Sequence, residues 1–487
     1  MEIRTEDLTP APVPAESRKD SPRTGRWYAG AVLVIVAVTA VAGGLRFYHL
    51  STPSSYVFDE VYYAKDGCFD AGYPYRACRL DNPAEQTATV HPPLGRWIIA
   101  GGEALFGNRP FGWRFASATF GTISVLLVSV LALLLFESLL WTAVSGLLLA
   151  TESLNFVQSR VSMLDIFLTT FVLAGYLFLV LDRRWIGRRT PPREESSGPG
   201  RDLDLLGLPP DRAPAPVLRP WRILSGLAFG AAFATKWSGA PALAGAILLA
   251  LAWERTRRRD LGSAHPVVET VRYEAFGIFL FLVLLPIAVY VASFGRYFAN
   301  THASFGEWWA LQRQMADFSL HLRATHPYAS KAWTWLLLKR PVAYYYMGVD
   351  AKTSAEILGI GNPAIFWGSI LAIPYALISW FRKRDWRAGL IAVAFLIQYI
   401  PWFFAARTDF LFYMAPMSPF LVLAVVYGLR AMSRARIGME RVRALAPVAA
   451  FVVVASIGLF VFFFPILIGQ TISYSAWHAR MWFPSWI

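Results

Sequence analysis

Long apolar runs alternate with polar, mostly basic segments along almost the whole chain. An α-helix needs about 20 predominantly apolar residues to cross a bilayer. Eleven runs approach that length, at 27–46, 111–136, 139–156, 161–181, 221–236, 239–254, 273–294, 363–380, 388–404, 411–429 and 446–468. The pattern predicts an all-α polytopic membrane protein with about eleven transmembrane helices.

The basic residues follow the alternation of these runs. The segments 183–220, 255–272, 381–387 and 430–445 carry Arg-rich clusters, and such clusters mark the cytoplasmic side of a membrane protein. This places the N-terminus in the cytoplasm and leaves 47–110 and 295–362 as two large extracytoplasmic loops. It also accounts for the net charge of +14, so we expect membrane lipids and no nucleic acid as partners.

Composition agrees with this arrangement. Of 487 residues, 56% are hydrophobic, which is too many for an ordinary soluble protein. Residues 1–26 are polar and Pro-rich and lack the short apolar core of a signal peptide, so we expect a disordered cytoplasmic tail. The segment 183–220 is rich in Pro, Gly, Arg and acidic residues and predicts a flexible linker.

The first outer loop contains an unusual acidic pair. "YVFDEVYYAKD" at 56–66 sets Asp59 beside Glu60, with Tyr62, Tyr63 and Asp66 following at helical spacing. A solvated loop explains such a pair without any function. Adjacent carboxylates among aromatic residues at a membrane surface also suit a general base.

A second motif, "HPPLGRWIIAGGEALFG" at 91–107, predicts an amphipathic helix over 92–106. Two prolines suit its first turn, and it is too short to span a bilayer. We expect it to lie in the membrane interface, with Arg96 and Glu103 on its polar face. The chain's two cysteines, Cys68 and Cys78, occur in the same loop, and an oxidising compartment favours a disulfide between them.

Further charged residues lie at the outer ends of several predicted spans. Each alone is explained as a loop or snorkelling charge. Gathered on the face opposite the basic loops, they favour a functional site. They are Arg114, Glu152, Arg160, Asp165, Lys236, Arg407 and Asp409.

These residue types together suit one kind of chemistry. A carboxylate can deprotonate a hydroxyl, aromatic rings suit sugar faces and lipid tails, and Arg binds a phosphate in a bidentate manner without a metal. There is no His/Cys cluster with metal-ligand spacing, so we expect no metal and no cofactor. The combination predicts sugar transfer from a polyprenyl-phosphate donor.

At these motifs the chain resembles the protein O-mannosyltransferases, membrane enzymes of the GT-C class, and most of all their actinobacterial branch. The resemblance runs from about residue 27 to the C-terminus. It rests on "FDEVYYAKD", "HPPLGRW", "WRFASATFG", "ESLNFVQSRVSMLDIFLTTF", "TKWSG", "THPYASKAWTW" and "FYMAPMSPF" in the family's order. It implies one GT-C catalytic domain over 27–487 in the cytoplasmic membrane, with its active site outside.

The resemblance also implies roles. The donor is polyprenyl-phosphate mannose, and the acceptor is a Ser or Thr hydroxyl of a protein emerging from the Sec translocon. Transfer inverts the anomeric centre. Asp59 takes the position of the general base and Glu60 that of an acceptor-orienting residue, although which of the two removes the proton stays open. Arg114, with Arg96 where the family often has Lys, takes the donor-phosphate position.

The remaining site residues are expected to support substrate binding. His91 is equally well explained as a catalytic residue and as a helix-capping residue. The supporting set is His91, Tyr62, Tyr63, Asp66, Glu152, Arg160, Asp165, Lys236 and Arg407.

One departure and three alternatives accompany this interpretation. The segment 295–362 is too short to hold the β-trefoil (MIR) domain of eukaryotic family members. A related GT-C enzyme could move a sugar onto a lipid or glycan instead of a protein. A transporter or flippase would require broken helices and polar groups near the bilayer midplane, and the chain shows no internal repeat. A structural scaffold would leave the Asp59–Glu60 pair unexplained.

Overall fold

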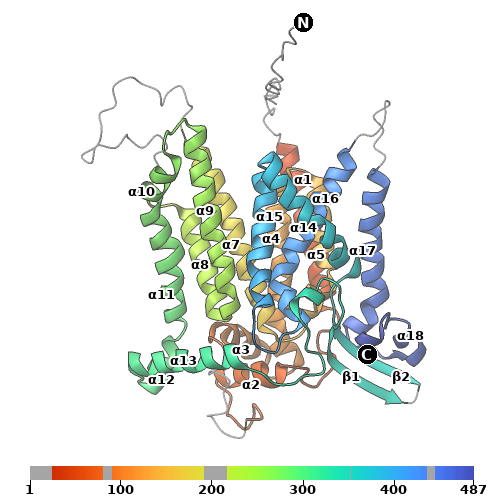
Figure 1. Cartoon of the computed structure of the whole chain (residues 1–487). Coiled ribbons are helices and arrows are strands. Elements are labelled where there is room, and N and C mark those ends of the chain that lie inside the picture. Colours follow the sequence, from red (N-terminus) through yellow and green to blue (C-terminus); the bar gives the residue numbers. More distant parts are fainter. Residues whose placement is uncertain (1–24, 81–89, 191–215, 351, 436–444) are drawn as a thin grey trace.

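The computed structural model describes residues 25–80, 90–190, 216–350, 352–435 and 445–487. Almost all of the expected tail 1–26 and most of the expected linker 183–220 lie outside these residues. The described chain forms an upright bundle of long helices that carries short helices and a small sheet at one end (Figure 1).

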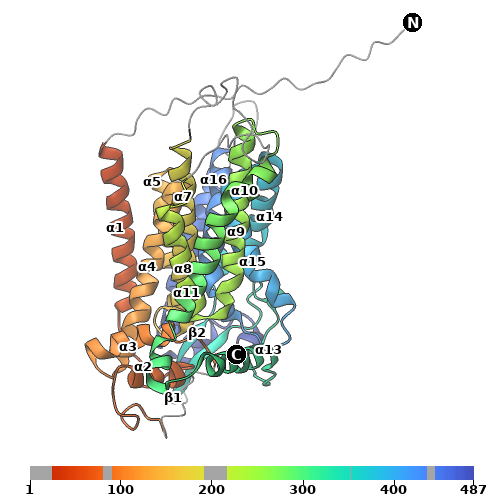
Figure 2. The same cartoon turned by 90° about the vertical axis from the view of Figure 1, so that its left-hand side faces the viewer.

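Eleven helical crossings make up the bundle in the described residues. They are α1 (Gly25–Phe47), α4 (Pro110–Phe136), α5 (Leu139–Ala150), α7 (Leu164–Gly187), α8 (Pro220–Thr235), α9 (Ala240–Asp260), α10 (Pro266–Phe279) continuing through a π-turn (Leu280–Leu284) into α11 (Leu285–Ala292), α14 (Pro363–Lys383), α15 (Trp386–Tyr399), α16 (Ser418–Arg434) and α17 (Ala446–Leu467). Nine of these crossings are long and apolar enough to span a membrane. The other two, α5 with 12 residues and α8 with 16, run beside longer neighbours (Figures 1 and 2).

Proline marks the start of several helices, and the helices differ in how much of their surface is buried. Proline stands in the first turn of α4, α8, α10, α14, α16 and α17, where its missing N–H leaves no helical hydrogen bond unmade. The helices α7 and α16 are buried along most of their length, whereas only a few residues of α1 and α17 are buried. The exposed side chains of α1 and α17 mark surfaces for lipid.

The two ends of the bundle differ. The start of α1 and the basic ends of α7, α9, α14 and α16 lie at the top of Figure 1. The opposite end carries α2 (Glu60–Asp70), α3 (Leu94–Phe106), α12 (Gly295–Thr301) and α13 (Phe305–His321). The described parts of the basic segments therefore share one end, as the charge pattern predicts, and the two large loops share the other.

A three-stranded antiparallel sheet is the one type of element that the sequence analysis missed. Its strands β1 (Val342–Asp350), β2 (Thr353–Gly359) and β3 (Ile472–Ser473) lie in that order. The run "VAYYYMGVD" is rich in the aromatic and β-branched residues that favour strands, but it is short and lies in a loop between helices. The fold is mostly helical as predicted, with this sheet as an addition.

The predicted amphipathic helix is present as α3, with one correction. Leu105 is 73% exposed, consistent with an apolar face toward lipid, but Arg96 and Glu103 are 6% and 0% exposed. The predicted polar face therefore packs against protein rather than water. Burial, with a smaller contribution from Glu60, raises the pKa of Glu103 to about 8, so this side chain is neutral at pH 7.

The disulfide predicted between Cys68 and Cys78 is present. Both residues are fully buried and form a small apolar cluster with Leu80. The bond joins the last turn of α2 to the segment that follows it. It therefore restrains the helix that begins directly after Asp59.

Candidate active site

A tight turn presents Asp59 at the start of α2. Phe58, directly before it, has a φ of 48°, which is uncommon and costly for a bulky residue, and its ring stacks on Tyr344 with the centroids 4.6 Å apart. Asp59 is the N-cap of α2, yet its side chain accepts no capping hydrogen bond. No side-chain partner for this carboxylate occurs within the described residues, so it stands in a fixed place with its oxygens available to a ligand.

Asp59 lines a cavity of about 540 Å³, a volume typical of small-molecule sites. The walls combine aromatic rings with a few charged groups from four distant parts of the chain. They are Phe58, Asp59, Tyr62, Tyr63, Val90, His91, Lys236, Phe318, Leu322, Ala324, His326, Arg407, Thr408, Phe410, Phe412 and Tyr413. A cavity with one free carboxylate, two cations and aromatic walls suits a sugar phosphate.

The two cations of this cavity are held by neighbours. The Nζ of Lys236 lies 2.9 and 3.0 Å from the two carboxylate oxygens of Asp165 and 4.9 Å from the centre of the Tyr413 ring. Arg407 donates to the carbonyl of Ser319 at 3.0 Å and to the Tyr413 hydroxyl at 3.1 Å. Because Tyr413 contacts both, Lys236 and Arg407 face the same part of the cavity.

The electrostatic surroundings of Asp59 suit a general base. Burial raises its pKa to about 6, with Lys236 lowering it and Asp165 raising it further. A carboxylate with this pKa is ionised at pH 7 and is a stronger base than an ordinary aspartate. At His91, burial together with Lys236, Arg407 and Arg96 holds the pKa well below its usual value, so its imidazole is neutral.

Glu60 and Arg114 form a separate, saturated unit. Two Arg114 N–H groups donate to the two Glu60 oxygens at 2.8 Å each, and the other three donate to backbone carbonyls of the loop 50–55. Glu60 also accepts the N–H groups of Val57 and Ser162 at 3.0 Å. The two side chains are 0% and 1% exposed, and neither lines the cavity.

This arrangement bears on the expected phosphate contact of Arg114. A guanidinium has five N–H donors, and in this structure all five are already used. Arg114 therefore has none left for a donor phosphate. Its position points instead to holding the loop that carries Asp59.

Four other expected site residues, Arg96, Asp66, Glu152 and Arg160, are also absent from the lining of the cavity. The Arg96 guanidinium lies 3.6 Å from Asp66 and 3.9 Å from Asp70, beside a separate cavity of about 110 Å³ between α3 and α12. Glu152 accepts three backbone N–H groups, including that of Asn362. Arg160 donates to four carbonyls at and just after the end of α1. These contacts join elements of the fold.

The structure adds site residues that the sequence analysis did not single out. Tyr344 comes from β1, while Phe410, Phe412 and Tyr413 come from or adjoin the 3₁₀ helix Leu411–Met417. The motif "FYMAPMSPF" contains two of these four residues, but its aromatic residues look like ordinary membrane residues in a sequence. Only their convergence on Asp59 reveals the role.

An apolar cavity of about 430 Å³ adjoins the first one. The two share His91, Lys236, Arg407 and Tyr413. The rest of the second lining is mostly apolar, including Trp237, Pro241, Leu320, Pro401, Trp402 and Phe404. Because Phe404 is 82% exposed, this cavity opens toward an apolar surface and suits a lipid chain.

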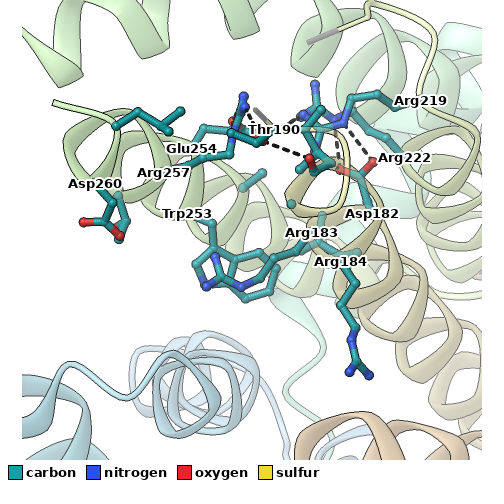
Figure 3. A pocket seen from close by; sticks show the side chains of 16 residues that line it. Asp182, Arg183, Arg184, Thr190, Arg219, Arg222, Trp253, Glu254, Arg257 and Asp260 are labelled. Carbon is teal, nitrogen blue, oxygen red and sulfur yellow. Dashed lines mark hydrogen bonds and ion pairs between the residues drawn. The ribbon is translucent and has the colours of Figure 1, made fainter. Parts of the chain in front are cut away.

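A further pocket of about 320 Å³ lies at the opposite end of the bundle, between α7, α8 and α9 (Figure 3). Here Arg219 pairs with Asp182 at 2.7 Å and with Glu254 at 2.6 Å. Glu254 also pairs with Arg257 at 2.7 Å. The dashed contacts of Figure 3 show charged groups that bind one another. None of the expected site residues lies in this pocket.

Comparison with known proteins identifies the family. A family model described as dolichyl-phosphate-mannose-protein mannosyltransferase matches residues 36–193, and one described as the C-terminal four-transmembrane region of protein O-mannosyltransferase matches 304–486. The polyprenol-phosphate-mannose–protein mannosyltransferase of Mycobacterium tuberculosis H37Rv is 30% identical over 93% of this chain and 91% of its own. The chain belongs to the protein O-mannosyltransferase family.

Another family member, from Mycolicibacterium smegmatis MKD8, is 31% identical over 92% of each chain. Among solved structures, the Saccharomyces cerevisiae Pmt1–Pmt2 protein O-mannosyltransferase complex bound to the sugar donor has a TM-score of 0.73 at 14% identity, covering 94% of this chain and 92% of that one. ArnT from Cupriavidus metallidurans bound to undecaprenyl phosphate has a TM-score of 0.51 at 16% identity, covering 92% and 77%. These likenesses confirm that this protein O-mannosyltransferase has the expected GT-C fold.

Proposed function

We propose that the protein transfers mannose from polyprenyl-phosphate mannose to Ser or Thr hydroxyls of polypeptides, with inversion at the anomeric carbon. The observation that carries this proposal is the free carboxylate of Asp59 in a cavity whose cations, Lys236 and Arg407, also line an adjoining apolar cavity. The names of the relatives describe the same donor and a protein acceptor.

The two cavities suggest how the donor binds. The polyprenyl chain lies in the apolar cavity beside Trp402 and Phe404. Its phosphate lies at the junction, where Lys236 and Arg407 neutralise charge. The mannose then occupies the aromatic cavity with its anomeric carbon toward Asp59.

The chemistry requires one proton transfer and one displacement. Asp59 accepts the proton of the acceptor hydroxyl while the hydroxyl oxygen forms a bond to the anomeric carbon. The bond from that carbon to the phosphate oxygen breaks, and polyprenyl phosphate leaves with the bonding electrons. Lys236 and Arg407 stabilise the negative charge that develops on the leaving group. Attack opposite the leaving group inverts the anomeric centre.

Glu60 and Arg114 serve this mechanism as positioning residues. Their ion pair fixes the loop 50–60 through bonds to its carbonyls and N–H groups. Preorganisation of this kind lowers the cost of placing a base at the reacting atoms. The proposal therefore assigns proton removal to Asp59 and a supporting role to Glu60.

An in vitro assay tests the function directly. Purified protein is given labelled polyprenyl-phosphate mannose and a Ser/Thr-rich peptide, and mass spectrometry detects the addition of one hexose. A parallel arm replaces the peptide with a glycolipid acceptor, and a proteoliposome arm without acceptor detects transport of the donor. Hexose on the glycolipid alone, or transport without transfer, would replace the proposal with another function.

We also propose the placement of the protein in the cell. The basic end of the bundle faces the cytoplasm, and Asp59 faces the outer side of the cytoplasmic membrane, where polypeptides leave the Sec translocon. The two native cysteines form a disulfide, so single cysteines at Arg188 and Ser304 can report topology. A membrane-impermeant maleimide should label intact cells at position 304 and not at 188; the reverse result would invert the orientation.

The proposed reaction assigns its charge stabilisation to Lys236 and Arg407 and takes no step through a metal or cofactor. We expect transfer to continue at an unchanged rate in EDTA. Loss of transfer in EDTA, with recovery on addition of a divalent cation, would require a revised mechanism.

A further inference from the structure

A third cavity adjoins the site and shares Ala406 and Arg407 with the apolar cavity. It has a volume of about 610 Å³ and shares Ala324, Arg407 and Thr408 with the cavity of Asp59. The turn 407–409 forms the boundary, and it is tied to the outer loop at several points: Thr408 donates to the carbonyls of Leu322 and Ala324. The two cavities are therefore neighbours across a well-held segment.

Asp409 is the unusual residue of this cavity. It is 3% exposed, and both of its carboxylate oxygens lack a hydrogen-bond partner in the described part of the chain. Its backbone carbonyl is held by the N–H of Ser330 at 2.8 Å, so the residue cannot turn freely. A buried carboxylate without donors is costly, and a ligand that brings an N–H or O–H group removes that cost.

The surroundings of Asp409 are strongly basic. Five basic side chains line the same cavity: Arg323, Lys331, Lys339, Arg340 and Arg407. Lys331 and Lys339 are exposed at the rim, and neither has an ion pair with a carboxylate among the described residues. The cavity therefore offers one inner acceptor of hydrogen bonds and an outer ring of positive charge.

We propose that this cavity binds the acceptor polypeptide, that Asp409 accepts a hydrogen bond from a main-chain N–H of the acceptor, and that the rim cations select Ser/Thr sites with acidic neighbours. The inference rests on the proposed function. A lipid is better placed in the apolar cavity, beside Trp402 and Phe404. A polypeptide approaching from water reaches Asp59 through the more polar cavity. Every residue of a polypeptide except proline has a main-chain N–H, which is the donor that the Asp409 carboxylate is missing.

Replacing Asp409 tests the inner contact. Asp409→Asn keeps the size of the side chain and removes its charge. The peptide KM is expected to rise about tenfold or more, because hydrogen bonds to charged groups are among the stronger ones, while the donor KM stays the same. The matched control is Asp317→Asn, in α13 of the same loop, whose side chain is 78% exposed and lies outside these cavities; its kinetics should match the wild type.

Peptide charge tests the rim. Three peptides share one Thr and carry two Asp, two Ser or two Lys residues beside it. Wild-type kcat/KM should fall in that order by roughly threefold per step, the size expected of exposed ion pairs. Lys331→Gln with Lys339→Gln should abolish the order. Lys352→Gln, an exposed lysine of the hairpin, should leave the order intact.

Direct binding of a fluorescent peptide, measured by anisotropy without donor, makes the test independent of transfer. Weaker binding in Asp409→Asn than in Asp317→Asn supports the inference even if transfer to peptides fails and the proposed function falls. Equal peptide binding and equal peptide KM in these variants overturn it. It is also overturned if inorganic phosphate or vesicles of anionic lipid compete with the peptide and peptide charge has no effect, since the cavity would then bind phosphate groups.

Discussion

Both ends of the helical bundle bury carboxylates near basic residues, but the ends differ in whether those carboxylates have side-chain partners. At the end shown in Figure 3, Asp182 and Glu254 lie 2.7 and 2.6 Å from the nitrogens of Arg219. At the other end, Asp59 and Asp409 have no side-chain partner among the described residues. The first end uses its charges to join helices, and the second leaves these two carboxylates for a ligand.

The same contrast recurs within two consecutive residues. The Glu60 carboxylate accepts four hydrogen bonds, two of them from Arg114, whereas the Asp59 carboxylate accepts none in the described structure. Both are acidic, both lie at the start of α2, and the sequence motif alone treats them as a pair. Hydrogen-bond satisfaction, rather than charge or burial, separates the residue that supports the fold from the residue that can react.

The strongest test of this contrast is Asp59→Asn. It should lower transfer about 10²–10⁴-fold, the usual contribution of a general base. Because the Asp59 carboxylate makes no hydrogen bond that the fold depends on, the thermal unfolding midpoint should not fall. Labelled-mannose turnover and thermal unfolding of the same preparation provide both numbers. More than a tenth of wild-type turnover would remove Asp59 from the role of base.

Glu60→Gln should do the opposite and lower the stability of the protein more than its transfer activity. It leaves Arg114 buried with an uncompensated charge, and breaking a buried ion pair from one side costs about 3–5 kcal/mol of stability. Transfer per folded molecule should fall less than in Asp59→Asn. Thermal unfolding and turnover corrected for the folded fraction are the measurements. A stable Glu60→Gln protein without transfer would make Glu60 the base and reverse the assignment.

Glu254→Gln is the matched change at the far end. Glu254 pairs with Arg219 and Arg257, so a similar loss of stability is expected for the same reason. Transfer per folded molecule should stay at the wild-type level, because this network lies at the end opposite Asp59. A specific loss of turnover would show that the two ends are coupled.

Much of the architecture was predictable from the sequence because it depends on length and hydropathy. Apolar runs of about 20 residues identify spans, and Arg clusters identify one side. The sheet was missed because β1 and β2, which pair as a local hairpin, lie in a loop that no apolar run or motif marked as strands. The pairing of β2 with β3 joins residues far apart in the sequence, which a sequence pattern does not show.

The site was predictable in part. Asp59, His91, Lys236 and Arg407 line the cavity, and each occurs in or beside a recognised motif. Arg114 was expected beside a phosphate, yet its five N–H groups are used within the protein. A sequence shows that a charge lies at a helix end but not whether a partner already satisfies it.

Lys236→Gln tests the proposed phosphate contact. A charge-assisted hydrogen bond contributes about 1.5–3 kcal/mol, so the donor KM should rise roughly 10–100-fold while the peptide KM changes little. The substitution also leaves Asp165 without its cation, so thermal unfolding must be measured to separate binding from stability. Lys331→Gln, a rim lysine outside the Asp59 cavity, is the control and should leave the donor KM unchanged. A larger effect on the peptide KM than on the donor KM would contradict the phosphate role.

The smallest expected effect is a dependence on pH that follows from the environment of Asp59. Burial raises its pKa to about 6, and a base acts only when deprotonated. With peptide saturating, kcat/KM for the donor should be flat above pH 7 and fall toward tenfold per unit below pH 6. Saturating peptide is needed because burial also raises the pKa of Asp409 to about 6.

The titration of Asp59 should not lower the stability of the protein at the low pH where kcat/KM falls. Its raised pKa means that the folded protein holds this proton more tightly than the unfolded chain, so protonation as the pH falls through 6 stabilises the fold at this residue. A parallel measurement of thermal unfolding therefore separates titration of the base from acid denaturation. If activity and the unfolding midpoint fall together, or if activity stays constant down to pH 5, the free carboxylate of Asp59 is not the base. The difference in hydrogen bonding between Asp59 and Glu60 would then not distinguish a reacting residue from a supporting one.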